Sequence, residues 1–306
     1  MNIVYLGTPD FAVLPLVKLV ENTNYNILAV VTNKDKPVGR KNVITPPPVK
    51  VVASKYGIPV YQYDKIRVEG VNDIKKLNPD IMITCAFGQI LSKEILDIPR
   101  FGTINIHASL LPKYRGASPI HHAILNGDKE TGISIMKTEL GVDTGDIIAT
   151  QKVAIENNET CGELFKKLSL VGADLLVKVL PEIFSGKANY VKQDHSKATF
   201  TKIFTKQDAL IDWNDSAENI YNKIRAFNPS PIAYCMLKNE PFKIYEAEVL
   251  DENANPGEII KADKQLIIAC KHGSLSLKTV QKAGGKAMEI NNFLLGNKFK
   301  VGEHFN

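Results

Sequence analysis

The chain has 306 residues, of which 44% are hydrophobic and 23% are charged, and its formal net charge is +5. This length suggests about two domains, and the composition is ordinary for a globular protein with a sizeable core. No apolar run approaches the roughly 18 residues that a membrane-spanning helix needs, and the N-terminus lacks the regions of a signal peptide. We therefore expect a cytoplasmic protein without a membrane partner.

The cysteines and histidines give little support for a metal site. Adjacent His121 and His122 would diverge by about 100° on a helix, so they would clamp one metal ion poorly. Four cysteines lie far apart without a Cys-x-x-Cys pair: Cys85, Cys161, Cys235 and Cys270. This spacing favours reduced thiols in a core over a disulfide framework or a metal site. We expect no metal.

In the first half of the chain, strand-forming runs alternate with helical patterns. Strands are predicted at residues 2–6, 27–31, 81–85, 103–107 and 131–137. Helices are predicted at residues 11–21 and near 48–57, 66–77 and 116–126. This alternation predicts an α/β fold with a mainly parallel sheet wrapped by helices. The turn at residues 7–12 lacks the G-x-G-x-x-G pattern, so a Rossmann-like fold is expected without a dinucleotide fingerprint.

A long connection between Thr32 and Lys50 has no visible period. It contains four prolines, and residues 33–50 carry five basic residues against one acidic residue. Nineteen residues without regular structure are too many for an ordinary crossover, which favours a functional loop. An insertion without function fits the pattern equally well.

The second half of the chain predicts a separate small domain. A helix is predicted at residues 161–184, with Thr160 as N-cap and Gly186 just past its end. A helix at 215–227 and five short strands between 232 and 280 suggest a small barrel or sandwich, of which an OB-like barrel is one form. The predicted limits are residues 1–188 for the first domain, 189–205 for a linker and 206–306 for the second domain.

Basic residues gather in two further regions. Residues 187–206 hold five lysines against one aspartate, and residues 261–306 hold eight lysines against three acidic residues. Local basic surfaces on a nearly balanced chain favour a polyanionic partner, although lysine runs are often plain solvated faces.

The stretch around Asn105 and His107 carries the most chemical information. The two residues alternate with Ile104 and Ile106, and a strand has a period of two, so both polar side chains share one face. They lie near the carboxyl end of the predicted strand, where open α/β sheets bind ligands. Taken alone, Asn-x-His also fits a half-buried strand whose polar face meets solvent or a helix.

Several motifs together resemble the 10-formyltetrahydrofolate-dependent formyltransferases. Those shared with the whole family are residues 105–112, 113–116 and 140–145. The resemblance sharpens to the family members that act on methionyl-tRNA through residues 7–12, 35–40, 48–50, 211–213 and 225–229. It runs nearly end to end, and it implies a Rossmann-like catalytic domain followed by a small OB-like barrel.

The resemblance implies a role for individual residues. The catalytic positions are Asn105, His107 and Asp143. The folate-binding turn comprises Ser109, Leu110, Leu111 and Pro112. Arg40 and Lys41 match the element that engages tRNA. The implied co-substrate is 10-formyltetrahydrofolate, and the implied partner is initiator methionyl-tRNA, with no protein partner and a monomeric enzyme.

These residue types suit transfer of a formyl group to an amine. Attack on the formyl carbon creates an oxyanion, to which Asn105 offers a neutral N–H donor. Protonated His107 adds a charge-assisted donor, and Asp143 favours that imidazolium or accepts the proton of the amine. Losing one oxyanion donor should raise the barrier by roughly 3–4 kcal/mol.

The chain departs from the family pattern at two places. The basic loop continues as Arg40-Lys41-Asn42-Val43, with less positive charge than usual. Ser230 stands where the family typically has tryptophan. We expect Arg115 to pair with a carboxylate and Trp213 to pack in a core.

Other functions fit the same motifs. They are a sugar-nucleotide N-formyltransferase, a formyltetrahydrofolate hydrolase and a non-catalytic tRNA-binding protein on the same scaffold. The basic regions speak against a small sugar substrate, and the three intact catalytic positions speak against a non-catalytic scaffold.

Overall fold

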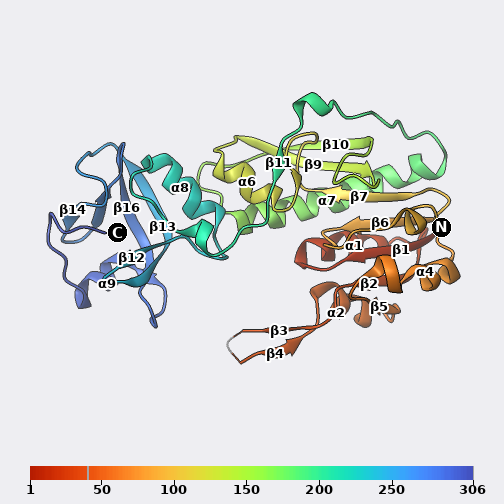
Figure 1. The fold of residues 1–306 in the computed structure, drawn as a ribbon, viewed down its shortest axis with the longest axis horizontal. Helices are drawn as coiled ribbons and strands as arrows, with labels where there is room; N and C mark the ends of the chain where they lie inside the picture. The colour runs from red at the N-terminus through yellow and green to blue at the C-terminus, as the bar shows by residue number, and fades with distance from the viewer. Residues whose placement is uncertain (40, 306) are drawn as a thin grey trace. The chain divides into compact units, whose positions relative to one another are not determined.

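The computed structural model describes residues 1–39 and 41–305 (Figure 1). The chain forms two compact units made of interleaved segments. The first unit comprises residues 1–116, 131–154 and 165–201, and the second comprises residues 117–130, 155–164 and 202–306. Because these units do not follow one boundary along the chain, the predicted domain limits at residues 188 and 206 stay a prediction.

The first unit is built on a seven-stranded sheet with the order β10-β9-β7-β6-β1-β2-β5. Its parallel strands are β1 (Asn2–Gly7), β2 (Asn26–Thr32), β5 (Val60–Gln62), β6 (Ile81–Cys85) and β7 (Thr103–His107). Strand β9 (Glu130–Lys137) pairs antiparallel with β7, and β10 (Ile147–Ala154) forms the edge. The predicted mainly parallel sheet is confirmed. Strands β5 and β10 were not predicted.

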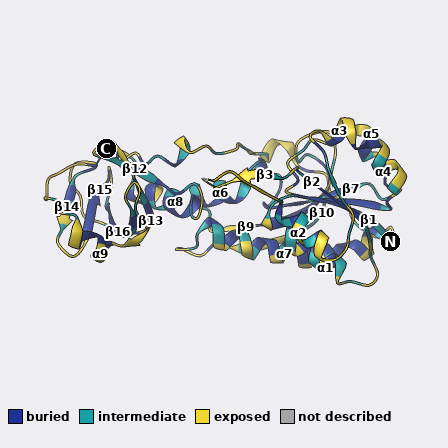
Figure 2. Ribbon diagram, turned by 90° about the horizontal axis from the view of Figure 1, so that it is seen from below, coloured by how far each residue is buried: buried dark blue, intermediate teal, exposed yellow. Residues whose placement is uncertain are grey.

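Helices cover the strands of this sheet, whose residues are largely buried (Figure 2). The helices are α1 (Val13–Val20), α2 (Pro48–Lys55), α3 (Ile66–Glu69), α4 (Val71–Leu77), α5 (Lys93–Leu96) and α7 (Cys161–Phe184). Val4 and Leu6 of β1 share a core cluster with Ile74 of α4. A Cβ atom at Gly172 of α7 would lie 3.0 Å from Cγ2 of Ile106, so α7 packs closely against β7.

Helix α7 begins and ends as the sequence predicts. The carboxylate of Glu163 accepts a hydrogen bond from the Thr160 backbone N–H at 2.9 Å, and Thr160 Oγ1 accepts one from the Glu163 N–H at 3.4 Å. This reciprocal pair is a capping box, which satisfies backbone donors that a helix start otherwise leaves open. No helix in the described part of the chain is both long and apolar enough to cross a membrane.

The connection between Thr32 and Lys50 contains regular structure, contrary to the prediction from the sequence. Strands β3 (Lys36–Val38) and β4 (Val43–Thr45) pair antiparallel as a hairpin. All six residues of these two strands are exposed. Because neither face of the hairpin is buried, its sequence has no alternation of apolar and polar residues that would reveal the strands.

The second unit contains an antiparallel sheet with the order β12-β13-β16-β15-β14, which forms a half-barrel. The strands are β12 (Tyr234–Leu237), β13 (Glu240–Leu250), β14 (Ile259–Ala262), β15 (Leu266–Ala269), β16 (Ser274–Gln281) and β17 (Met288–Glu289), which pairs with β16. The helices are α6 (Pro119–Leu125), α8 (Ala217–Ala226) and α9 (Ile290–Gly296). Trp213 is buried in the core of this unit, as expected. The predicted fold class, a Rossmann-like sheet domain followed by a small barrel-like domain, is confirmed.

Candidate active site

Strand β7 presents the predicted polar pair at its carboxyl end. Ile104 and Ile106 are buried, Asn105 is half-buried and the side chain of His107 is only 6% exposed. A strand with a period of two places Asn105 and His107 on one face and the isoleucines on the other, as the sequence predicts.

Asp143 joins this pair from the loop between β9 and β10. Its Oδ1 accepts a long hydrogen bond from Nδ2 of Asn105 at 3.4 Å, and its Oδ2 lies 3.6 Å from Nδ1 of His107. Asp143 has a φ of +50°, which sharply turns the loop at this residue. The amide and the imidazole of β7 therefore meet, within a few ångströms, a carboxylate that lies 38 residues after Asn105 in the sequence.

The two ring nitrogens of His107 face two acceptors. Nε2 lies 2.9 Å from the carbonyl oxygen of Tyr114, and this oxygen can only accept, so Nε2 carries a proton. In the neutral ring, Nδ1 would then direct a lone pair at the Asp143 carboxylate. A ring protonated on both nitrogens would donate toward both partners.

Thr84 on the neighbouring strand β6 orients the amide of Asn105. The two residues are register partners in the parallel pair, and Thr84 Oγ1 donates a hydrogen bond to Asn105 Oδ1 at 2.9 Å. The carbonyl end of the amide therefore faces Thr84, and the NH₂ end faces Asp143. The sequence prediction missed Thr84. The available signal was a single hydroxyl in the buried, otherwise apolar run at residues 81–85.

Gly116 holds the Asp143 carboxylate with its backbone N–H, which donates to Oδ2 at 2.8 Å. Gly116 belongs to the short strand β8 (Arg115–Gly116), which pairs with β11 (Phe200–Thr201). Its φ is +103°, and a Cβ atom there would lie 2.8 Å from the carbonyl oxygen of Thr201. Any side chain would strain this position, so glycine is needed to keep the N–H aimed at Asp143.

Arg115 pairs with an amide rather than with the expected carboxylate. Its side chain is buried, and its Nε and Nη2 donate to Oε1 of Gln193 at 3.0 and 2.6 Å. The NH₂ group of Gln193 donates to the backbone oxygens of Asp143 at 2.9 Å and Gly145 at 2.7 Å. Gln193 thus braces the Asp143 loop, a role that sequence reasoning missed because residues 186–205 show no period.

The turn predicted to bind folate follows β7 directly and divides into buried and accessible members. Ser109 is buried, and its Oγ donates to the backbone oxygen of Lys113 at 2.6 Å. Leu111 is also buried, and its N–H donates to Oγ of Ser134 at 3.1 Å. Leu110 and Pro112 are half-buried, so they are the members that offer side-chain surface.

Of the two residues predicted to contact tRNA, the structure describes Lys41, which lies at the turn between β3 and β4. Lys41 is exposed there. Arg40 lies outside the described residues. Among residues 1–39 and 41–305, no group of three or more His, Cys, Asp or Glu side chains is placed to hold a metal ion.

Comparison with known proteins decides the family. A model of the formyl transferase family matches residues 1–180, and a model of the formyl transferase C-terminal domain matches residues 203–298. The chain belongs to the formyl transferase family. The site at the end of β7 lies within the first matched region.

Relatives and solved structures agree with this membership. The methionyl-tRNA formyltransferase of Streptococcus mutans is 44% identical over 308 aligned positions, which cover 99% of each chain. Two solved structures share the fold at lower identity. An N-formyltransferase from Helicobacter canadensis, in complex with folinic acid and dTDP-3-aminofucose, is 22% identical with a TM-score of 0.67, covering 92% of this chain and 98% of that one. The methionyl-tRNA formyltransferase from Clostridium thermocellum is 20% identical with a TM-score of 0.57, covering 81% and 93%.

Proposed function

We propose that this protein transfers the formyl group of 10-formyltetrahydrofolate to the α-amino group of methionine esterified to initiator tRNA. The assignment of the substrate rests on the 44% identity, over 99% of both chains, to a relative named methionyl-tRNA formyltransferase. The convergence of Asn105, His107 and Asp143 supports the chemistry. The product is N-formylmethionyl-tRNA for translation initiation, and the enzyme works in the cytoplasm as a monomer.

Asn105 stabilises the charge that develops on the formyl oxygen. The amine forms a bond to the formyl carbon, and the carbonyl electron pair moves to oxygen. A preorganised N–H donor stabilises this oxygen without rearranging in the transition state. Thr84 supplies the preorganisation because its hydroxyl donates to the other end of the amide at 2.9 Å.

Asp143 accepts the proton of the attacking amine, and His107 acts beside it. Asp143 has an accepting oxygen beside Asn105, and it takes the proton as the new C–N bond forms. When protonated, His107 adds a positive charge beside the oxyanion, while its two ring nitrogens face Tyr114 and Asp143. The bond to the nitrogen of the donor then breaks, and that nitrogen receives a proton, so the steps need no covalent enzyme intermediate.

The folate donor is proposed to bind along the turn at residues 109–112. When bound, it supplies an electrophilic formyl carbon. Leu110 and Pro112 offer apolar surface to a flat ring system, while Ser109 and Leu111 hold the shape of the turn through their internal hydrogen bonds. The H. canadensis structure with folinic acid supports a folate-type donor for this fold.

The tRNA is proposed to meet the β3–β4 hairpin. Lys41 at its turn, together with Arg40 as its neighbour in sequence, is proposed to contact phosphates. Lys50 at the base bonds to both carboxylate oxygens of Asp35, at 2.9 and 2.8 Å, and to Gln62 at 2.8 Å. These bonds hold the two ends of the segment that contains the hairpin, so they support the hairpin where it joins the first unit.

The test is a direct assay with purified protein, 10-formyltetrahydrofolate and charged initiator tRNA. We expect N-formylmethionyl-tRNA, with a much lower rate for elongator methionyl-tRNA. A dTDP-linked amino sugar serves as the competing acceptor. Formylation of the sugar without formylation of the tRNA would overturn the proposal. Equal rates for the two tRNAs would remove only the initiator selectivity.

A second arm separates a catalyst from a tRNA-binding protein. The Asn105→Ala variant should keep its affinity for charged tRNA and lose formyl transfer. If wild type binds tRNA tightly but forms no product under any folate concentration, the chain is a binding protein on this scaffold.

A further inference from the structure

The loop that carries Asp143 has no regular structure of its own. Residues 138–146 connect β9 to β10 outside any helix or strand, and two apolar side chains just before Asp143 face solvent, with Leu140 66% and Val142 62% exposed. A loop of this kind keeps one conformation only where contacts from elsewhere hold its backbone. The position of the Asp143 carboxylate therefore depends on those contacts.

The contacts between Asp143 and its catalytic partners are long. Its Oδ1 lies 3.4 Å from Nδ2 of Asn105, and its Oδ2 lies 3.6 Å from Nδ1 of His107, which exceeds the usual length of a strong hydrogen bond. The short bonds come from Gly116, whose N–H donates to Oδ2 at 2.8 Å, and from Gln193. The NH₂ group of Gln193 donates to the backbone oxygens at positions 143 and 145, at 2.9 and 2.7 Å. These two bonds from Gln193, called the brace below, hold the backbone that carries the carboxylate.

Gln193 uses every hydrogen-bonding position of its amide. Oε1 accepts from Nε and Nη2 of Arg115 at 3.0 and 2.6 Å, and the two N–H groups make the brace. An amide offers one oxygen with two lone pairs and two N–H hydrogens, so all four are occupied. A guanidinium only donates, so Arg115 determines which end of the Gln193 amide faces the loop.

Gln193 is not placed to touch a substrate. The residue is 6% exposed, and its four bonds all go to groups of the protein. Arg115 has a second acceptor in Nδ1 of His195 at 3.1 Å, so Gln193 is not its only partner. Among the residues that Gln193 holds, Asp143 is the one that belongs to the catalytic set.

We propose that Gln193 is a positioning residue for formyl transfer and that it acts through Asp143. Asp143 accepts the proton of the attacking amine in the proposed function, on which this role rests. The brace keeps the carboxylate beside Asn105 and within reach of the amine. A displacement of about 1 Å in a reacting group lowers a rate by on the order of 10²-fold. Loss of the brace therefore slows the chemical step and leaves substrate binding unchanged.

The test compares two variants that change an amide to an acid. Gln193→Glu keeps an acceptor for Arg115 but turns an oxygen, instead of the NH₂ group, toward the two backbone oxygens. We expect kcat to fall at least about tenfold, with KM unchanged for 10-formyltetrahydrofolate and for charged tRNA.

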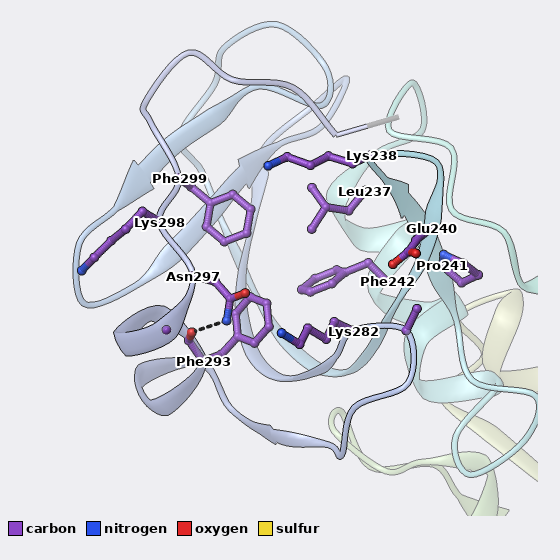
Figure 3. A pocket seen from close by; sticks show the side chains of 12 residues that line it. Leu237, Lys238, Glu240, Pro241, Phe242, Lys282, Phe293, Asn297, Lys298 and Phe299 are labelled. Atoms are coloured by element: carbon purple, nitrogen blue, oxygen red, sulfur yellow. Dashed lines mark hydrogen bonds between the residues drawn. The ribbon is translucent and has the colours of Figure 1, made fainter.

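The matched control is Asn297→Asp in the second unit. Asn297 lines a cavity of about 330 Å³, and its side-chain N–H donates to the backbone oxygen of Phe293 at 2.8 Å (Figure 3). The control thus also removes an amide donor from a backbone oxygen, and it should keep the wild-type kcat.

Two kinetic outcomes would overturn the proposal. One is a wild-type kcat in Gln193→Glu when Gln193→Met, which also removes the acceptor for Arg115, is slow, because Gln193 would then serve only Arg115. The other is a raised KM with an unchanged kcat in Gln193→Glu, which would assign Gln193 to substrate binding.

A double-mutant comparison tests whether Gln193 acts through Asp143. In an Asp143→Asn background, the carboxylate that the brace positions is absent. Adding Gln193→Glu there should lower the single-turnover rate by less than about threefold. Enzyme in excess over charged tRNA makes slow transfer measurable. The same factor in both backgrounds would show that Gln193 acts on another group, and the proposal would fail.

Hydrogen exchange of backbone amides tests the brace without any substrate. In Gln193→Glu, the amides of residues 138–146 should exchange faster than in wild type, while those of β7 keep the wild-type rate. Unchanged exchange in the loop would overturn the brace. If wild type forms no N-formylmethionyl-tRNA, the proposed function falls, and this measurement still judges the brace separately.

Discussion

Thr84 determines which end of the Asn105 amide faces Asp143. An amide can rotate to exchange its donor and acceptor ends, and only one orientation presents an N–H to a developing oxyanion. The hydroxyl of Thr84 donates to the oxygen end at 2.9 Å and so favours this orientation. Thr84 is therefore a positioning residue that acts through Asn105.

Asn105→Ala should lower the rate of formyl transfer by about 10²–10³-fold, since it removes one oxyanion donor. Thr84→Val keeps the shape of the side chain but leaves the amide without its partner. We expect a smaller loss in Thr84→Val, with KM for both substrates unchanged. Single-turnover rates at saturating folate measure both effects. A wild-type rate in Thr84→Val would show that other contacts orient the amide.

Sequence reasoning reached some of these residues and missed others for a physical reason. Asn105 and His107 stand out because their alternation with isoleucines is local. Asp143 came only from the family resemblance. Thr84 and Gln193 act through hydrogen bonds to residues that are distant in sequence, so no local pattern marks them.

The β3–β4 hairpin is the element through which the proposed tRNA contact can be tested. Lys41→Gln removes one cation from its turn, and each phosphate contact releases about one counterion. The affinity for charged tRNA should fall, and the plot of log K against log salt concentration should become shallower by about one. Titrations at several salt concentrations measure this slope.

The matched control is Lys76→Gln on α4, which is also exposed. This variant should keep both the affinity and the salt slope of wild type. The same slope for Lys41→Gln and wild type would remove Lys41 from the interface.

Helix α6 carries a histidine whose burial should make the stability of the protein depend on pH. The ring of His121 lies 5.8 Å from that of Phe204 and 6.3 Å from that of Phe227. Burial lowers the pKa of His121, and the charge of neighbouring His122 lowers it further. The unfolded chain therefore binds a proton near pH 6.5 that the folded chain binds only at lower pH.

It follows that the free energy of unfolding decreases as the pH falls below about 6.5, by at most about 1.4 kcal/mol per pH unit from this group. His121→Phe removes this contribution. Urea denaturation at pH 7.5 and 5.0 should show a smaller decrease for His121→Phe than for wild type. The exposed His304→Gln should behave like wild type, and an unchanged decrease in His121→Phe would contradict the assignment.

At the scale of elements, the sequence predicted strands whose residues are largely buried. Strands β6 and β7 begin and end at the predicted residues. The hairpin was missed because both of its faces are exposed, and β5 was missed because three residues are too few to show a period.

The whole molecule keeps its four cysteines buried, and this burial should protect them chemically. Burial raises the pKa of Cys85, Cys161 and Cys270 to about 12, and it raises that of Cys235 further. Since only the thiolate attacks a disulfide reagent, the native protein should react very slowly with Ellman's reagent at pH 8. Four thiols should react at once in guanidinium chloride. A rapid native phase would show an accessible thiol.

The fold class at this scale was predictable because it rests on the alternation of strands and helices along the chain. The grouping of chain segments into the two compact units was not predictable from the sequence. Residues 117–130 and 155–164 belong with residues 202–306, and such a grouping depends on contacts between distant segments.

The brace that Gln193 provides has a practical consequence for dividing the protein. A fragment truncated after residue 188 would keep Asn105, His107 and Asp143 but discard Gln193, leaving Arg115 buried without its amide partner. It would also lose β11, against which Gly116 is fitted. Expression of the folded catalytic half by itself therefore needs a chain that continues at least through Thr201.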